Sequence, residues 1–188
     1  MARTLSNMIP LGTTLPVFAL PDVVSGRIFS STELKSARAA VVMFICNHCP
    51  FVKHVNKELV KLAYDYIPVG VMFIAISSND VQNFPDDSPE NMKEHAKSVG
   101  YSFPYLYDET QEVARLFDAA CTPDFYIFND LQKLIYRGQL DNSRPSLDVP
   151  VTGKDVRNAL NLAINGLPVS EFQRPSIGCN IKWKKQNH

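Results

Sequence analysis

The chain has 188 residues, of which 45% are hydrophobic and 20% charged, a composition typical of a soluble globular protein with one sizeable core. Its 19 basic and 19 acidic residues balance, which argues against a nucleic-acid partner because such proteins concentrate positive charge on one surface. No stretch approaches the roughly 18 apolar residues that span a membrane, so we expect no membrane partner.

The N-terminal segment is interrupted by Pro10, Pro16 and Pro21 and has no clean apolar core, so no signal peptide is expected. We therefore expect a cytoplasmic protein in a reducing compartment. In such a compartment cysteines are more often catalytic or metal-binding than structural bridges.

In chain order, the first predicted elements are two short strands within 16–29, which form a β-hairpin that turns near Ser25. Residues 39–45 are a continuous apolar run with β-branched members, which indicates a strand buried on both faces. Apolar residues then recur at steps of three and four over 51–66, which predicts an amphipathic helix. A second apolar run, 69–76, predicts another buried strand.

Two more helices are predicted from their caps. Ser88 followed by a proline starts a helix over 89–99, which should stop at Gly100. Asp108, with a glutamine three residues later, offers a capping box for a helix over about 109–119.

The last elements are strands at 125–128 and 133–138, a helix from Thr152 that is closed by Gly166, and a tail without periodicity. Alternating βαβ units followed by an antiparallel pair and a closing helix predict an α/β fold, a mixed central sheet with helices on both sides. We expect one domain over 1–166, on which the tail 167–188 packs.

The stretch CNHCPF carries two cysteines, Cys46 and Cys49, between a predicted strand and a predicted helix. A thiolate at a helix start meets unpaired backbone N–H groups and the positive end of the helix dipole. We therefore expect a lowered pKa for Cys46, with Cys49 one turn further into the helix and placed to close a disulfide. His48, between them, is a candidate for tuning the cysteine pKa.

The pair could also bind metal. Together with Cys121 and Cys179 it would supply four thiolates, enough for tetrahedral zinc. Structural zinc sites usually bring their ligands as two close pairs, whereas these two further cysteines lie far apart in the sequence. We therefore expect no metal.

Longer stretches resemble a known family: VFALPDVVSG, VVMFICNHCPFVKHV, AACTPDFYIFN and PSIGCNIKWK. They resemble the thioredoxin superfamily, and more closely its peroxiredoxin-like branch of AhpC/TSA-type redoxins that carries a C-x-x-C pair. The resemblance implies a thioredoxin fold with an N-terminal β-hairpin and a C-terminal tail. It also implies that Pro123 is cis, that the backbone of Thr122 is open to an extended substrate, and that Cys121 lies near the Cys46–Cys49 pair.

By the same resemblance Cys49 falls at the peroxide-reducing position of peroxiredoxins. The family pattern P-x-x-x-T-x-x-C, however, meets Val42 in place of proline and Cys46 in place of threonine. The arginine of the family is replaced, in approximate register, by residues 121–123. The missing groups polarise the peroxide, so we expect a peroxiredoxin scaffold that performs thioredoxin chemistry.

We accordingly expect a thiol–disulfide oxidoreductase that uses Cys46 and Cys49 through a mixed disulfide, with no cofactor beyond their redox-active disulfide. Its substrate would be a protein or small-molecule disulfide or a peroxide, and an external dithiol would restore it. Two alternatives stay open. One is a weak thiol peroxidase with antioxidant activity that uses Cys49 or Cys46, and the other is a redox-inert or metal-holding binding module.

The tail cysteine, Cys179, is the least expected of the four. If the tail folds back over the sheet, Cys179 could act as a second resolving thiol or bridge to Cys121. Alternatively Ile181 and Trp183 anchor the tail by burial and Cys179 is packing. Cys121 and Cys179 are therefore candidates for additional redox thiols.

Overall fold

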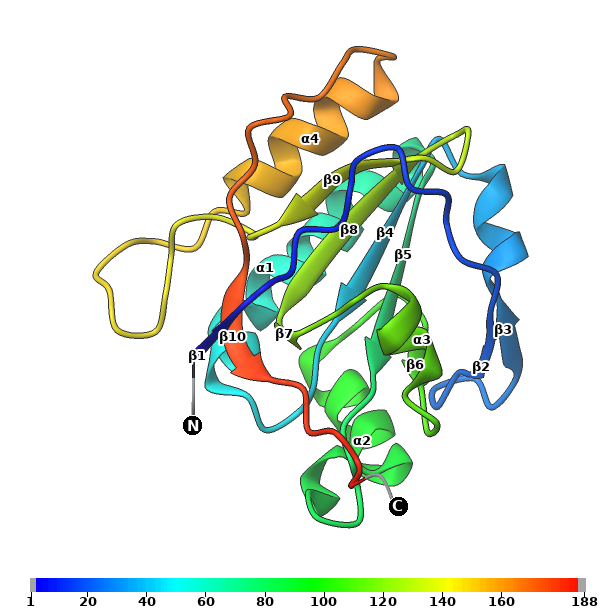
Figure 1. The fold of residues 1–188 in the computed structure, drawn as a ribbon, viewed down its shortest axis with the longest axis vertical. Coiled ribbons are helices and arrows are strands. Elements are labelled where there is room, and N and C mark those ends of the chain that lie inside the picture. The colour runs from blue at the N-terminus through cyan, green and yellow to red at the C-terminus, as the bar shows by residue number, and fades with distance from the viewer. Residues whose placement is uncertain (1–2, 186–188) are drawn as a thin grey trace.

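The centre of the protein is a five-stranded mixed sheet with the strand order β6-β5-β4-β8-β9 (Figure 1). The computed structural model describes residues 3–185. The strands are β4 (Ala39–Phe44), β5 (Val71–Ser77), β6 (Tyr105–Tyr107), β8 (Asp124–Asn129) and β9 (Leu134–Gly138). β4, β5 and β6 run parallel, whereas β8 is antiparallel to both β4 and β9.

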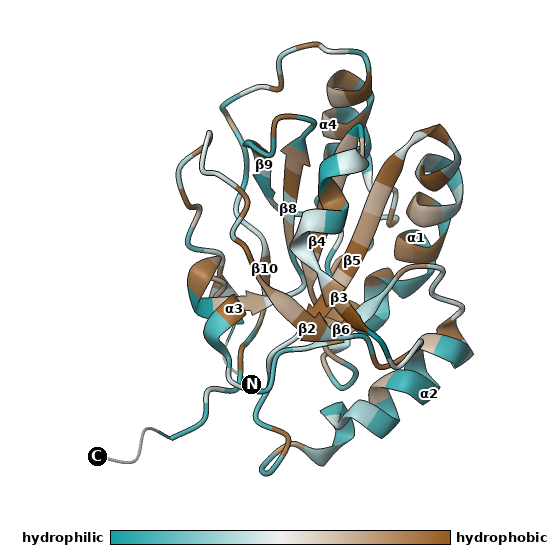
Figure 2. Cartoon of the chain, turned by 90° about the vertical axis from the view of Figure 1, so that its right-hand side faces the viewer, coloured by the Kyte–Doolittle hydropathy of each residue, from teal (hydrophilic) through white to brown (hydrophobic). Residues whose placement is uncertain are grey.

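Helices cover both faces of this sheet. They are α1 (Pro50–Tyr66), α2 (Pro89–Val99), α3 (Glu112–Leu116) and α4 (Lys154–Ile164), with short 3₁₀ turns η1 (Ser31–Ser36), η2 (Ile67–Val69) and η3 (Pro85–Asp87). Apolar side chains of α1, α2 and α4 form one core cluster, and those of α3 and η1 join a second. Figure 2 shows β5 and β8 as hydrophobic strands at the centre. The predicted α/β class with a thioredoxin-like arrangement is confirmed.

Most predicted elements lie within a residue or two of their predicted bounds. α2 stops at Gly100, as expected. The backbone of Gly100 has a φ of 87°, which lies in the left-handed region that favours glycine. The helix predicted over 109–119 is wrong in length, since α3 covers only five residues. Gln111 lies at a φ of 63° and interrupts the helix, while the Asp108 carboxylate accepts a hydrogen bond from the backbone N–H of Ala114 at 2.9 Å.

The predicted N-terminal hairpin is present as β2 (Ala19–Pro21) and β3 (Ile28–Ser30). A further small sheet was not predicted: β1 (Arg3–Leu5), β10 (Ile177–Asn180) and β7 (Cys121–Thr122). β10 lies between the other two and is antiparallel to both, so strands from the first and the last part of the chain, β1 and β10, lie side by side (Figure 1). The tail is thus not irregular throughout, and its last residues, 186–188, lie outside the described part.

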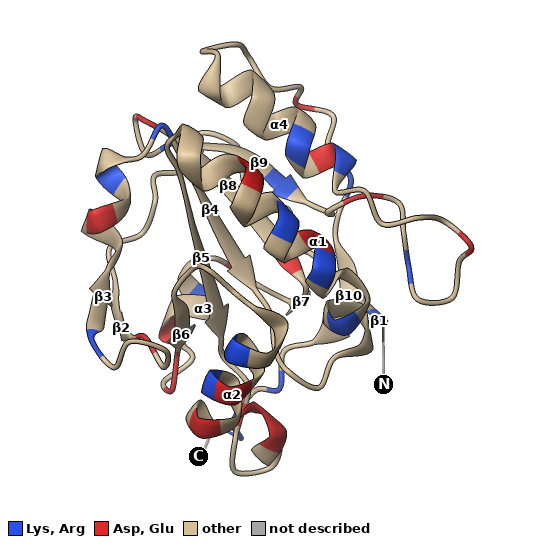
Figure 3. Ribbon diagram, turned by 180° about the vertical axis from the view of Figure 1, so that it is seen from behind, with Lys and Arg blue, Asp and Glu red and all other residues tan. Residues whose placement is uncertain are grey.

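Charged side chains of both signs alternate on the outer elements, most clearly on α2 (Figure 3). The buried residues of the central strands β4 and β5 are uncharged. Within residues 3–185, no helix combines the length and the apolar character that crossing a membrane requires.

Candidate active site

The cysteine pair lies in the loop between β4 and α1, as the sequence predicts. The helix begins at Pro50, which suits the first helical position because proline needs no N–H acceptor there. Cys49 is therefore the residue that caps α1, and Cys46 lies three residues before it. The expectation that Cys46 occupies the helix start, with Cys49 one turn inside, is wrong. Both side chains are buried, Cys46 at 2% and Cys49 at 0% exposure.

Three cysteines converge at this point. Cys46 and Cys49 lie close enough for each thiol to shift the pKa of the other. Cys49 Sγ lies 2.9 Å from Cys179 Sγ and 3.2 Å from the carbonyl oxygen of Thr122. Cys46 Sγ lies 3.5 Å from Thr122 Oγ1. The fold thus joins the loop before α1, the segment before β8 and the tail in one sulfur cluster.

The surroundings shift the pKa values of Cys46 and Cys49 in opposite directions. The neighbouring Cys46 thiol holds the pKa of Cys49 well below its ordinary value against the opposing effect of burial, with help from Cys179, Thr122 and the backbone of Val52. The Cys49 thiol and burial raise the pKa of Cys46. The charge of the pair therefore rests on Cys49, and the expected low pKa of Cys46 is corrected.

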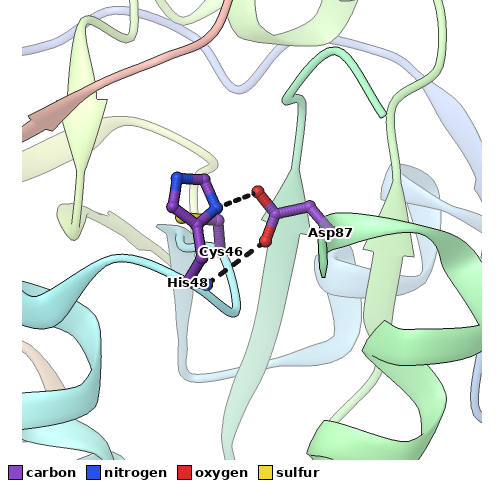
Figure 4. A group of neighbouring side chains, drawn as sticks. All are labelled: Cys46, His48 and Asp87. Atoms are coloured by element: carbon purple, nitrogen blue, oxygen red, sulfur yellow. Dashed lines mark hydrogen bonds and ion pairs between the residues drawn. The ribbon is translucent and has the colours of Figure 1, made fainter. Parts of the chain in front are cut away.

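His48 is held by a buried carboxylate that the sequence analysis missed (Figure 4). His48 Nδ1 lies 2.6 Å from Asp87 Oδ2, and Asp87 also accepts hydrogen bonds at 2.7 Å from the backbone of Asn47 and the side chain of Asn79. The hydrogen bond to Asp87 raises the pKa of His48 against the effect of burial. Burial acts to raise the pKa of Asp87, but the bonds from His48 and Asn79 hold it below its usual value.

The His48–Asp87 pair predicts a pH dependence of stability. The pKa of His48 is raised in the folded protein. Its contribution to the free energy of unfolding is therefore present below the ordinary histidine pKa of about 6.5, and it is lost as the pH rises through the folded pKa. The pKa of Asp87 is lowered in the folded protein. Its contribution to the free energy of unfolding is therefore present above the ordinary aspartate pKa of about 3.9, and it is lost as the pH falls through the folded pKa. We expect the stability difference between wild type and Asp87→Asn to shrink as the pH rises above about 6.5.

Urea unfolding of both proteins over a range of pH measures this difference. Asp86→Asn is the matched control, since Asp86 is the exposed neighbour of Asp87. A wild-type advantage over Asp87→Asn that stays constant across neutral and alkaline pH would contradict the assignment.

The peptide bond between Thr122 and Pro123 is cis, as the resemblance implies. The backbone of Thr122 is not open, however, because β10 pairs with β7 and places Cys179 opposite Thr122. Gly178 makes this close approach feasible, since a Cβ there would collide with the carbonyl oxygen of Thr122. The edge expected to receive a substrate is therefore covered by the chain's own tail.

Cys121 is buried near this cluster. Its Sγ lies 3.9 Å from the carbonyl oxygen of Pro123, and burial together with the nearby carboxylate of Asp124 raises its pKa. Asp124 is itself fully buried, which raises its pKa to about 8. Of the two additional cysteines, the structure brings Cys179 into contact with Cys49, whereas the Cys121 sulfur contacts the carbonyl oxygen of Pro123.

A metal could be considered at Cys46, His48 and Asp87, whose potential ligand atoms all lie within 4.8 Å of one another. Both oxygens of Asp87 already accept hydrogen bonds, from the backbone N–H of Asn47 on one side and from Asn79 and His48 on the other. A satisfied hydrogen-bond network accounts for this cluster better than a metal site does.

Comparisons with known proteins place the chain in a family. A model of the AhpC/TSA family matches residues 11–137. None of the curated proteins matches the chain. Among solved structures, an uncharacterized conserved protein from Geobacillus kaustophilus is 59% identical, with a TM-score of 0.97 over 100% of this chain and 99% of that one. A hypothetical protein from Sinorhizobium meliloti is 45% identical, with a TM-score of 0.95 over 97% and 100% of the two chains.

A more distant structure shares the fold alone. A thiol:disulfide interchange protein from Chlorobium tepidum is 20% identical, with a TM-score of 0.64 over 81% of this chain and 97% of that chain. Because the family model spans well over half of the sequence, the chain belongs to the AhpC/TSA family, within the peroxiredoxin-like branch of the thioredoxin superfamily, and this membership supports a thiol-based redox function.

Proposed function

We propose that the protein is a thiol–disulfide oxidoreductase whose working dithiol is Cys46 and Cys49. The observation that carries the proposal is the place of Cys49 as the residue that caps α1, where its thiol lies beside Cys46 and its pKa is lowered. A thiolate is the nucleophile in disulfide exchange, so Cys49 and not Cys46 attacks the substrate. This reverses the roles that the sequence alone suggests.

In the forward reaction the Cys49 thiolate attacks one sulfur of a substrate disulfide and the other substrate sulfur leaves as a thiolate. Cys46 then loses its proton and attacks the Cys49 sulfur, which breaks the bond between Cys49 and the substrate. The substrate sulfur that was bound to Cys49 takes up that proton. The substrate gains two electrons and the pair becomes a disulfide. An external dithiol reduces this disulfide and completes the cycle.

His48 supports the second step. A ring nitrogen lies within 4.8 Å of the Cys46 sulfur, and Asp87 raises the pKa of His48 so that its ring carries positive charge over a wider pH range. A positive charge there stabilises the thiolate that Cys46 must form. His48 therefore tunes the pair, and Asp87 positions His48.

Access to the pair shapes the choice of substrate. Both sulfurs are buried, and β10 covers the side of Cys49 that faces Thr122. An open groove between α1 and α2 is lined by His48 together with Lys53, Glu94 and His95. A small-molecule disulfide or an extended peptide that enters this groove would reach the pair with less rearrangement than a folded protein surface.

A weak thiol peroxidase is the second candidate, because Cys49 combines a lowered pKa with the position of the peroxide-reducing cysteine of its family. Peroxide would oxidise Cys49 to a sulfenic acid, and Cys46 would resolve it with release of water. Two nearby arginines do not assist, since Arg137 donates to the carbonyl of Ile9 and Arg144 to the carbonyl of Asp141. We therefore expect peroxide to oxidise the pair more slowly than a disulfide does.

A redox titration in graded glutathione buffers tests the proposal, with free thiols alkylated and each cysteine mapped by mass spectrometry. In a Cys179→Ser variant, where the neighbouring tail sulfur cannot exchange with the pair, we expect one two-electron transition for the Cys46–Cys49 bridge, at a potential above the roughly −270 mV of thioredoxin. A pair that never bridges in any buffer would refute the proposal. Stoichiometric zinc in protein purified without chelator would favour the metal-holding module, and faster oxidation by hydrogen peroxide than by oxidised glutathione would favour the peroxidase.

A further inference from the structure

The tail strand β10 lies where a substrate segment would pair with the cis-proline loop. Cys179 is opposite Thr122, and its sulfur is 2.9 Å from that of Cys49. We propose that Cys179 is a third redox thiol. Its sulfur attacks Cys49 in the Cys46–Cys49 disulfide, releases Cys46 and forms a Cys49–Cys179 disulfide. This inference rests on the proposed dithiol and adds an internal acceptor to it.

The strand that carries Cys179 is held on both sides. On one side β10 pairs with β7, and on the other Arg3 of β1 pairs with Cys179. Gly178 allows the backbone of β10 to lie directly against Thr122. Cys179 is buried there, so its sulfur is held next to Cys49 by the sheet and not by an exposed loop. Sulfurs that already contact each other need little backbone movement to bond.

The exchange is balanced within the chain. Cys179 loses its proton and its sulfur attacks Cys49; the Cys46–Cys49 bond breaks and the Cys49–Cys179 bond forms. Cys46 leaves with the electron pair and takes up the proton. Burial of Cys46 favours its protonated form, because a buried thiolate is poorly solvated. No oxidant is consumed, because the two electrons were already removed when the first disulfide formed.

The second disulfide changes what the site can do. It returns Cys46 to the thiol form and ties β10 covalently over Thr122. The substrate edge is then closed until a reductant attacks the new bond. Cys179 therefore acts as a resolving thiol that stores the oxidised state in a form shielded by the tail.

Disulfide mapping tests the proposal in the full-length protein. Trypsin is expected to place Cys46 and Cys49 together in peptide 39–53 and Cys179 in peptide 158–182, because it does not cleave before Pro175. The reduced protein is oxidised with glutathione disulfide, quenched with acid and alkylated at successive times. We expect the bridge within 39–53 to form first and to be replaced by a cross-link between the two peptides.

Three variants make the result decisive. Cys179→Ser should lose the cross-link and accumulate the bridge within 39–53, whereas Cys121→Ser, the matched control, should behave as wild type. Cys46→Ser should still form the cross-link after Cys49 reacts with glutathione, which identifies Cys49 as the partner. If the Cys49–Cys179 disulfide is favoured tenfold over the Cys46–Cys49 disulfide, the midpoint potential of wild type in a redox titration should be about 30 mV more negative than that of Cys179→Ser.

The outcomes separate the two proposals. If wild type keeps the bridge within 39–53, forms no cross-link and titrates like Cys179→Ser, the third thiol is refuted and the proposed dithiol stands. If Cys179→Ser forms no bridge within 39–53 in any buffer, the proposed dithiol is refuted, whether or not wild type is cross-linked. Cross-linking through Cys46 in a Cys49→Ser variant would also overturn the assignment of Cys49 as the partner.

Discussion

Cys49→Ser is expected to lower the rate of disulfide reduction by a factor on the order of 10³ or more, because a serine hydroxyl cannot replace a thiolate as the nucleophile. Cys46→Ser is expected to behave differently. Its Cys49 still attacks the substrate, but the mixed disulfide has no Cys46 to resolve it. In the Cys46→Ser, Cys179→Ser double variant this adduct should accumulate, since both neighbours of the Cys49 sulfur are then absent.

Rapid-mixing kinetics with a model peptide disulfide, followed by intact-protein mass spectrometry, measures both effects. Each variant replaces only one or two sulfur atoms by oxygen, and circular dichroism of each variant shows whether it has folded. Trapping of the peptide on Cys46 in Cys49→Ser, together with an inactive Cys46→Ser, would contradict the assignment. It would restore the roles that the sequence alone suggests.

Gly178→Ala is expected to destabilise the protein by about 2 kcal/mol and to expose the cysteine cluster, because the new methyl group would collide with the carbonyl oxygen of Thr122. β10 would have to move away from β7, and the pairing of Cys179 with Thr122 would be strained or lost. Urea unfolding measures the stability. The rate at which iodoacetamide alkylates Cys49 and Cys46 measures the exposure, and we expect it to rise.

Gly100→Ala is the matched control for this substitution. Gly100 lies at a φ of 87° with open space around its Cα, so an alanine there costs about 1 kcal/mol of backbone strain without displacing a neighbour. It should leave the alkylation rate unchanged. Equal alkylation rates in the two variants would show that β10 does not shield the pair.

Local patterns were sufficient for most of the scaffold. The apolar run of β4, the periodicity of α1 and the cap residues of α2 each predict an element whose observed bounds differ by at most one residue. These features depend on burial and backbone hydrogen bonding within one short segment, so the signal is present in that segment. The cis peptide before Pro123 followed from the resemblance of a longer motif and not from local rules.

The short strand β10 and the contacts between remote residues of the site leave no such signal in the sequence. β10 has four residues, one of them Gly178, and it forms only because β7 and β1 offer it two edges. The hydrogen bond between His48 and Asp87 joins positions 39 residues apart, and no sequence pattern relates them. Both features depend on where the fold places remote segments.

The sequence by itself determined the α/β class, the strand-to-helix junction and the presence of a Cys46–Cys49 pair. The tertiary structure decided that the pKa of Cys49 is lowered, because that depends on the first residue of α1 and on the neighbouring thiols of Cys46 and Cys179. It also decided that the tail covers Thr122. Ionisation and access are set by distances of a few ångströms between segments that are remote in the chain, and a linear pattern does not encode those distances.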